Sequence, residues 1–320
     1  MKPWPNRIRQ HVDTWTQKCR KLNIKWWPSF AYHFTDVQNA ASILTCGEIL
    51  SRAQAQQRGL MRNDNAAADV ISGTPSAYQR YARLYFRPRT PTQFHNEGIR
   101  APRDRYHQAH CPVPVFFCFD LAKLLAEDDV EFSDGSLGRP EVRVGADQDL
   151  FDSIPFDLVY HDRGYRAGED RSTITFHRHA EILVPERLTL THLAGIACRS
   201  DAERRTLLHL LPTAQWPNWA PRIRCVGDPL FYRDRPHVDS VHGADGVLHV
   251  RFNAFSPGLP IRVRCRGQDN REWSWEGQLD SPSFSLRFVN MSDERPEIAL
   301  YIHDCLAFCS RVNLQDELPF

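Results

Sequence analysis

Three short stretches combine side chains that could bind phosphate and stabilise positive charge: "YHFT" (32–35), "YFRPRTP" (85–91) and "RHAEILVP" (178–185). In the first, His33 stands at the end of a predicted strand, just before a predicted helix. The N-terminus of a helix attracts anions through its free N–H groups and its dipole. Taken alone, His33 fits a packed histidine at a strand end at least as well as a ligand contact.

The second stretch spaces two arginines by two residues. Its prolines favour an extended chain, which would place Arg87 and Arg89 on one face. A fixed guanidinium suits bidentate contact with phosphate better than an ammonium does. A solvated basic edge strand explains the same residues equally well.

The third stretch places a carboxylate beside an apolar run. Glu181 directly precedes Ile182, Leu183 and Val184. A carboxylate buried in such a strand is costly unless it is paired or hydrogen-bonded. Glu181 is therefore either turned outward by strand alternation or kept for its chemistry.

Hydrophobic spacing and punctuation predict the elements that would position these residues. Thr35 and Gln38 read as a capping box for the helix after "YHFT", and Gly47 reads as its stop. The predicted helices are 6–23, 35–47, 121–128 and 200–211, and the predicted strands are 29–35, 113–120, 156–162 and 174–184.

The last hundred residues have a different pattern. After the Pro- and Trp-rich segment 212–221, apolar and polar residues alternate in short runs separated by turn residues, which predicts an antiparallel sandwich. We therefore predict an α+β domain over 1–220 and a small all-β sandwich over 221–320. Trp273 and Trp275 share a strand face and read as core residues more readily than as a ligand platform.

Composition narrows the class of protein. The 40 basic and 39 acidic residues give a net charge of +1, so any attraction to nucleic acid must come from local clusters. Nine cysteines without a C-x-x-C pair, a start without a signal peptide, and no apolar run of membrane length predict a soluble cytoplasmic protein. A metal site is not indicated by the spacing of Cys305, Cys309 and His303, and we expect no metal.

Taken together and in this order, the segments "FAYHFTDVQNAASILTCGEILSR", "YARLYFRPRTP" and "RHAEILVPERLTL" resemble the DarT family of DNA-modifying ADP-ribosyltransferase toxins over about residues 28–200. The resemblance implies an ADP-ribosyltransferase-like fold of two packed antiparallel sheets with flanking helices. It also implies NAD as the ADP-ribose donor and a base of DNA, thymine or guanine, as the acceptor. Because a modified base must be unstacked, single-stranded DNA is the expected substrate.

The resemblance also implies roles for individual residues. Glu181 matches the catalytic glutamate, which holds a ribose hydroxyl and helps to deprotonate the acceptor base. Arg89 matches the essential arginine and would grip the NAD phosphates. The other residues matched to NAD binding are His33, Phe34, Thr35, Gly47, Leu50, Tyr85 and Phe86.

The acceptor side is less well defined by the motifs. Arg87 stands where relatives commonly carry a small polar residue, and we assign it to nucleic acid together with residues of the loop before Glu181. Those loop residues are His161, Arg163, Tyr165, Arg166 and Arg171. Arginines and aromatic residues alternate through 78–106, a composition typical of single-strand binding surfaces.

Other functions stay open at this point. A relative that modifies RNA or protein, and an inactive nucleic-acid-binding module of the same fold, share most of these features. The family's role implies a toxin of a toxin–antitoxin or phage-defence system, with an antitoxin, such as a macrodomain hydrolase, as partner. The sandwich carries no chemical signature.

Overall fold

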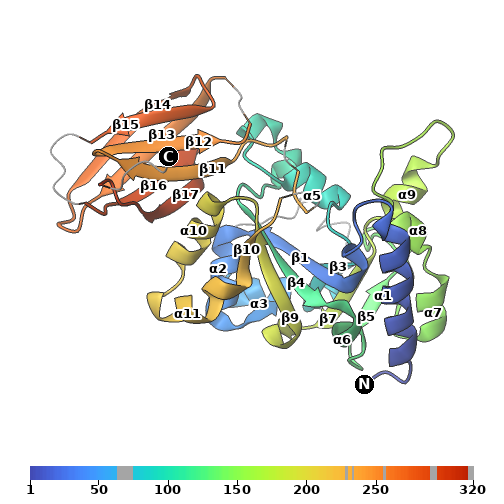
Figure 1. Ribbon diagram of the computed structural model, residues 1–320. Coiled ribbons are helices and arrows are strands. Elements are labelled where there is room, and N and C mark those ends of the chain that lie inside the picture. Colours follow the sequence, from blue (N-terminus) through green and yellow to red (C-terminus); the bar gives the residue numbers. More distant parts are fainter. Residues whose placement is uncertain (63–74, 228–229, 233, 255–256, 289–293, 316–320) are drawn as a thin grey trace. The chain divides into compact units, whose positions relative to one another are not determined.

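The computed structural model describes residues 1–62, 75–227, 230–232, 234–254, 257–288 and 294–315 (Figure 1). The chain forms two compact units. The first comprises Met1–Phe34, Ser42–His95 and Phe116–Ile196, and the second comprises Thr35–Ala41, Asn96–Val115 and Ala197–Phe320.

Short helices and strands alternate up to residue 198. The helices are α1 (Pro5–Arg20), α2 (Val37–Cys46), α3 (Arg52–Gln57), α5 (Pro91–Asn96), α6 (Leu121–Leu125), α7 (Gln148–Ser153), α8 (Phe156–Val159) and α9 (Arg171–His177). The strands are β1 (Phe30–Asp36), β2 (Glu48–Leu50), β3 (Tyr81–Tyr85), β4 (Pro114–Asp120), β5 (Glu131–Ser133), β6 (Val144–Gly145), β7 (Glu181–Pro185), β8 (Arg187–Thr189) and β9 (Leu193–Cys198).

One sheet organises the first unit. Its strands follow the order β10-β9-β4-β1-β3-β7-β5-β6, where β10 (Ile223–Cys225) is an edge strand, and β2 pairs with β8 in a small sheet of two strands. Strands β3 and β7 run antiparallel, with Tyr85 opposite Glu181 and Arg83 opposite Leu183. This register brings the "YFRPRTP" and "RHAEILVP" stretches side by side, although about a hundred residues separate them in sequence.

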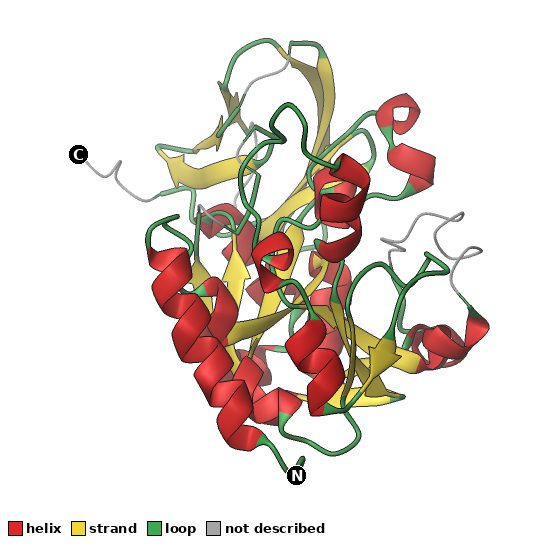
Figure 2. Cartoon of the chain, turned by 90° about the vertical axis from the view of Figure 1, so that its right-hand side faces the viewer, coloured by secondary structure: helices red, strands yellow, loops and turns green. Residues whose placement is uncertain are grey.

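Helix α1 packs on aromatic residues of α7 and α8, and Figure 2 shows it as the long helix near the N-terminus. The His11 ring lies 4.1 Å from the Phe156 ring and 5.0 Å from the Phe151 ring, measured between centroids. The His11 Nε2 atom is 3.2 Å from the Tyr160 hydroxyl. Burial lowers the pKa of His11 to about 3, so this histidine is neutral at physiological pH.

Three local predictions were wrong. Residues 156–159 form α8 and not a strand, and α9 occupies most of the first half of the predicted strand 174–184, so that β7 begins at Glu181. The Asp170 carboxylate accepts hydrogen bonds from the Ser172 and Thr173 amides and starts α9 as a helix. Helix α2 is capped by Asp36, which accepts from the Gln38 amide at 3.0 Å, whereas Thr35 belongs to β1.

The α-helices and strands that follow residue 198 number two and eight within the described residues. They are α10 (Asp201–Leu210), α11 (Trp216–Trp219), β10 (Ile223–Cys225), β11 (Val238–Ala244), β12 (Val247–Phe252), β13 (Leu259–Arg266), β14 (Glu272–Leu279), β15 (Ser283–Arg287), β16 (Glu297–Ile302) and β17 (Cys305–Arg311). Strands β11-β12-β15 form one sheet of the predicted sandwich, and β14-β13-β16-β17 form the other.

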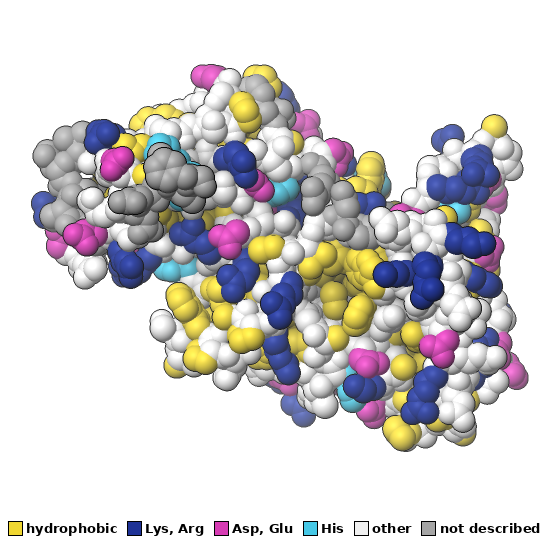
Figure 3. All heavy atoms as spheres, viewed as in Figure 1, with side chains coloured by type: hydrophobic (Ala, Val, Ile, Leu, Met, Phe, Trp, Pro, Cys, Tyr) yellow, Lys and Arg dark blue, Asp and Glu magenta, His cyan; other side chains and the backbone are white. Residues whose placement is uncertain are grey.

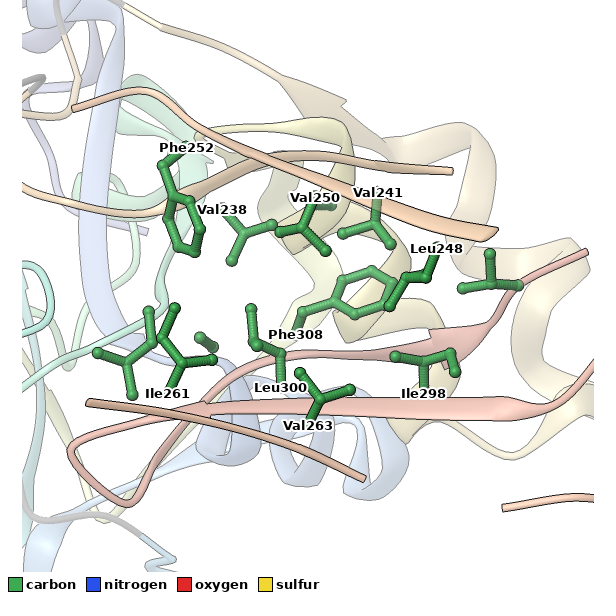
Figure 4. Packing of buried hydrophobic residues seen from close by; sticks show 14 of the residues in the cluster. Val238, Val241, Leu248, Val250, Phe252, Ile261, Val263, Ile298, Leu300 and Phe308 are labelled. Atoms are coloured by element: carbon green, nitrogen blue, oxygen red, sulfur yellow. The ribbon is translucent and has the colours of Figure 1, made fainter. Parts of the chain in front are cut away.

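The sandwich core lies between these two sheets. Figure 4 shows Val241 and Val250 pointing towards Val263 and Leu300, with the Phe308 ring between them. Trp273 and Trp275 are partly buried against this core, and their rings contact those of Phe288 and Phe284. The all-β C-terminal part is confirmed, and these two tryptophans are packing residues.

Helix α10 belongs to the second unit and is tied to the sandwich. The Ser200 hydroxyl caps α10 at the Glu203 amide and donates to the Val238 carbonyl at 2.6 Å. The Cys309 amide donates to the Thr206 hydroxyl at 3.0 Å. The predicted boundary between residues 220 and 221 stays a prediction. Among the described helices, none is both long enough and apolar enough to cross a bilayer.

Candidate active site

Glu181 is held by an arginine that the sequence had not singled out. The carboxylate stands at the first residue of β7 and is 1% exposed. Arg83, on the adjacent β3, donates from Nε to Oε2 and from Nη2 to Oε1, both at 2.5 Å. The Glu181 amide donates to the Ser133 hydroxyl at 3.0 Å. Glu181 is therefore a buried carboxylate that is paired at both of its oxygens.

His33 supports the strand that carries Arg83. Its Nδ1 lies 3.0 Å from the Arg83 carbonyl oxygen. Because a carbonyl only accepts, Nδ1 carries the proton, and burial lowers the pKa of His33, which keeps the ring neutral. The predicted ligand-binding histidine thus touches the backbone of the residue that holds Glu181.

Arg87 does not face a nucleic-acid partner. The side chain is 2% exposed, and its guanidinium stands 4.7 Å from the centre of the Trp27 ring. It donates to the carbonyls of Pro88, at 2.9 Å, and Val159, at 3.0 Å, and to that of His161. The predicted assignment of Arg87 to nucleic acid was wrong, because its donors hold the chain segment that leads into the loop before Glu181.

Arg89 stands in a different conformation from Arg87. Its φ of 55° lies in the left-handed region, which is unusual for a residue other than glycine and is a form of backbone strain found at functional sites. The Arg89 amide donates to Oε1 of Gln93 at 2.6 Å. Burial raises the pKa of Asp162, and the positive charges of Arg87 and Arg89 oppose that shift. Both arginines therefore lie near the start of the loop.

The loop before Glu181 brings several of the predicted acceptor-binding residues together. Arg178 donates to the Arg163 carbonyl at 2.7 Å and to His161 Nδ1, and its guanidinium lies 4.9 Å from the Tyr165 ring centre. Arg171 stands 5.5 Å from the same ring. Tyr165, at 36% exposed, is thus an aromatic surface flanked by two cations, a combination that suits unpaired nucleotides.

Glu169 is hydrogen-bonded to two other residues of this loop. Its carboxylate accepts from Arg163 Nη1 at 3.0 Å and from the Arg166 amide at 2.8 Å. The hydrogen bond from Arg163 lowers the pKa of Glu169 to about 2. Figure 3 shows Lys and Arg side chains gathered on the projection that carries α9 and this loop. Arg178 was absent from the predicted acceptor set, and its position three residues before Glu181 was the available signal.

The remaining residues matched to NAD binding have mixed surroundings. Phe86 is fully buried and packs against Phe156, so its side chain supports the strand and is not available to a ligand. Thr35 is also buried, and Phe34 contacts the Phe116 ring at 5.3 Å. Tyr85 follows Arg83 on the same face of β3, and burial raises its pKa to about 12.

Two more of the matched residues follow α2. Gly47 ends the helix with φ of 79°, a conformation that favours glycine, and a Cβ there would meet nothing within 4 Å. Leu50 ends β2. NAD contacts for these residues stay predictions.

A cavity of about 710 Å³ lies between α1 and the loop. Its lining residues come from α1, α8, the loop and the start of α9, and they include Trp15, Lys18, Leu22, His161, Asp162 and Arg163. Acidic residues of the loop and of α8, together with Asp170 at the N-cap of α9, are part of the same lining. The cavity is therefore mixed in charge.

Cys305 and Cys309, which the sequence places four residues apart, have separate surroundings. Cys305 Sγ accepts from Arg105 Nη2 at 3.2 Å and lies 3.5 Å from His110 Nδ1. Cys309 lies with His209 and Glu297, and their potential ligand atoms are within 4.8 Å of one another. Arg266 donates to Glu297 at 2.7 Å and already supplies a positive charge there.

Comparisons with known proteins agree with this architecture. Residues 32–228, more than half of the chain, match the family model described as "ssDNA thymidine ADP-ribosyltransferase, DarT". The DarT of Thermus sp. 2.9 in complex with ADP-ribosylated ssDNA is similar in structure, with a TM-score of 0.51 at 19% identity over 64% of this chain and 97% of that chain. The same Thermus protein in complex with carba-NAD+ gives a TM-score of 0.50 at 17% identity over 64% and 98%. The sequence matches no curated protein.

Proposed function

Because the chain belongs to the DarT family of ssDNA thymidine ADP-ribosyltransferases, we propose that it transfers ADP-ribose from NAD to thymidine in single-stranded DNA, with Glu181 as the catalytic carboxylate. The observation that carries the proposal is the buried, doubly paired Glu181 at the start of β7. Cleavage of the bond between nicotinamide and ribose develops positive charge on the ribose, which a fixed carboxylate stabilises.

Arg89 is proposed to bind the NAD phosphates. A guanidinium presents a planar fork of donors that matches phosphate oxygens. Its position near Asp162 places it next to the loop that precedes Glu181. His33, Phe34, Thr35, Gly47, Leu50 and Tyr85 are proposed to line the rest of the NAD site, with Thr35 contributing through its backbone because its side chain is buried.

The loop that contains His161, Arg163, Tyr165, Arg166 and Arg171 is proposed to receive the DNA. Tyr165 offers a ring on which a base can stack, and Arg171 and Arg178 flank it with positive charge. A toxin role and an antitoxin partner are part of the same proposal, as is a cytoplasmic location, where NAD and DNA are both available.

The test compares wild-type protein with Glu181→Gln, which keeps the side-chain volume and removes the charge. Both are incubated with NAD and single-stranded oligonucleotides, and adducts are measured by mass spectrometry. We expect the variant to lose transfer by a factor of at least about 10³, since electrostatic stabilisation is a large part of catalysis, while its affinity for NAD in calorimetry stays close to that of the wild type.

Transfer by Glu181→Gln at the wild-type rate would refute the assigned role. Free ADP-ribose without a nucleic-acid adduct would point to a protein acceptor. An adduct on RNA alone would change the acceptor class.

A further inference from the structure

We propose that Arg83 is the positioning residue of this reaction: it fixes the Glu181 carboxylate through two hydrogen bonds, so that Glu181 stabilises positive charge on the ribose and a different group removes the proton from the acceptor base. The inference rests on the proposed function and deepens it. None of the three sequence motifs assigned Arg83 to the site, and in the structure it is hydrogen-bonded directly to the Glu181 carboxylate.

The geometry of the pair is that of a guanidinium fork on a carboxylate. Each Glu181 oxygen accepts from a different Arg83 nitrogen, at 2.5 Å in both cases. Two parallel hydrogen bonds fix the carboxylate plane, which a single contact would leave free to rotate. Arg83 is itself anchored, because its carbonyl accepts from His33 and its strand pairs with β7.

Because the Glu181 carboxylate is buried, it needs a positively charged partner, and Arg83 is that partner. The Glu181 side chain is 2% exposed, and that of Arg83 is 32% exposed. A carboxylate removed from water without a cation takes up a proton. Burial alone would lower the pKa of Arg83, but the charge of Glu181 outweighs it and raises that pKa above its usual value. Arg83 therefore keeps its positive charge beside the buried Glu181 carboxylate.

The other titratable groups around the pair do not supply the positive charge that Arg83 supplies to Glu181. Burial raises the pKa of Tyr85 to about 12 and lowers that of His179 to about 4, so both are neutral near pH 7. His33 is neutral for the same reason. From β5, Glu131 is hydrogen-bonded to Tyr81. The next residue after β5, Asp134, is paired with Arg143 at 2.7 Å.

The arrangement has a chemical consequence. A carboxylate whose two oxygens are both engaged by a guanidinium keeps its charge but is a weaker proton acceptor. It is well suited to stabilise a positively charged ribose, where charge and not proton affinity is required. Removal of the base proton is then the task of a group outside the pair.

The experiment measures kcat against pH for wild type, Arg83→Gln and Arg83→Lys, with NAD and single-stranded DNA. Arg143→Gln is the matched control, because it removes an arginine from another buried carboxylate of the same unit. In Arg83→Gln we expect the acidic limb of the profile to move up by about one to three pH units, with activity partly recovered at high pH. Arg83→Lys keeps the charge and should move the limb less.

A purely structural role for Arg83 would lower kcat by the same factor at every pH, and that result would overturn the proposal. The proposal would also be overturned if the pH profile of kcat for Arg143→Gln moved as far as that of Arg83→Gln.

A double-mutant cycle separates failure of this proposal from failure of the proposed function. The free energies of unfolding of Arg83→Gln, Glu181→Gln and the double variant are measured in urea. Removing one partner leaves a buried charge, so the double variant should be more stable than the sum of the single losses predicts. Additive losses would contradict the pairing, whether or not the wild type modifies DNA.

Discussion

Arg87 and Arg89 are two residues apart in sequence and have different roles in the structure. Alternation along an extended chain predicts that both point to one side, but β3 ends at Tyr85 and the left-handed conformation of Arg89 breaks the alternation. Arg87 turns inward to Trp27 and to backbone carbonyls. Of the two, Arg89 is therefore the arginine that we propose for phosphate binding.

Replacing Arg89 with alanine should therefore weaken NAD binding. A charge-assisted hydrogen bond contributes about 1.5–3 kcal/mol, so we expect the dissociation constant to rise by about tenfold to a hundredfold in calorimetry. Arg20→Ala, at the exposed end of α1, is the control and should bind NAD as the wild type does. Unchanged NAD affinity in Arg89→Ala would exclude the phosphate role.

Motif order was enough to predict Glu181 and Arg89 as site residues from the sequence, and their roles remain to be tested. Arg83 could not be found in this way, because its partner lies 98 residues away and the pairing depends on the register of β3 with β7. Nothing in the sequence distinguished Arg83 from the other arginines of residues 78–106. In the structure, Arg80 pairs with Glu186, Arg83 pairs with Glu181 and Arg87 is buried, so these three are not free surface cations.

Among the helices and strands, residue composition gave the wrong secondary structure for two segments. Residues 156–159 and 174–177 are rich in aromatic and β-branched side chains, which favour strands, yet they form α8 and part of α9. The helix predicted over 200–211 agrees with α10 to within one residue at each end, and the Ser200 side chain caps it at the Glu203 amide.

Ser200 offers a test at this scale, because its hydroxyl satisfies both the Glu203 amide and the Val238 carbonyl. We expect Ser200→Ala to lower the free energy of unfolding by about 2 kcal/mol, from the lost cap and the lost hydrogen bond. Urea unfolding measures it, with Thr14→Ala on the exposed side of α1 as control. A loss no larger than that of the control would show that the cap does not stabilise α10.

At the scale of the whole molecule, a chain of net charge +1 contains a local concentration of arginines around Tyr165 and a separate β-sandwich. The sandwich was predictable because each of its strands alternates between core and surface residues. It lies beyond the residues matched by the family model. No chemical pattern in the sequence marks its role.

Buried histidines make the stability of the whole chain sensitive to acid. The pKa of His11 is lowered to about 3 by burial, against 6.5 for an exposed histidine. The unfolded chain thus binds a proton first, and stability is lost as the pH falls from 6.5 towards 3, by up to about 1.4 kcal/mol per pH unit for one histidine.

We expect His11→Gln to show a shallower decline of the unfolding free energy between pH 6.5 and 4 than the wild type. The exposed His107 provides the control as His107→Gln. Parallel pH dependences for wild type and His11→Gln would show that the His11 ring is not buried as described.

Transfer of ADP-ribose to thymidine is tested by mass spectrometry of a single-stranded DNA oligonucleotide that contains one thymidine, after incubation with NAD and the full chain. The same oligonucleotide with cytidine in place of thymidine, its duplex and its RNA counterpart are treated in parallel. We expect one ADP-ribose adduct on the single-stranded, thymidine-containing DNA, and none on that DNA with the Glu181→Gln variant. An equal yield on the oligonucleotide without thymidine, or NAD consumption without any DNA adduct, would contradict this expectation.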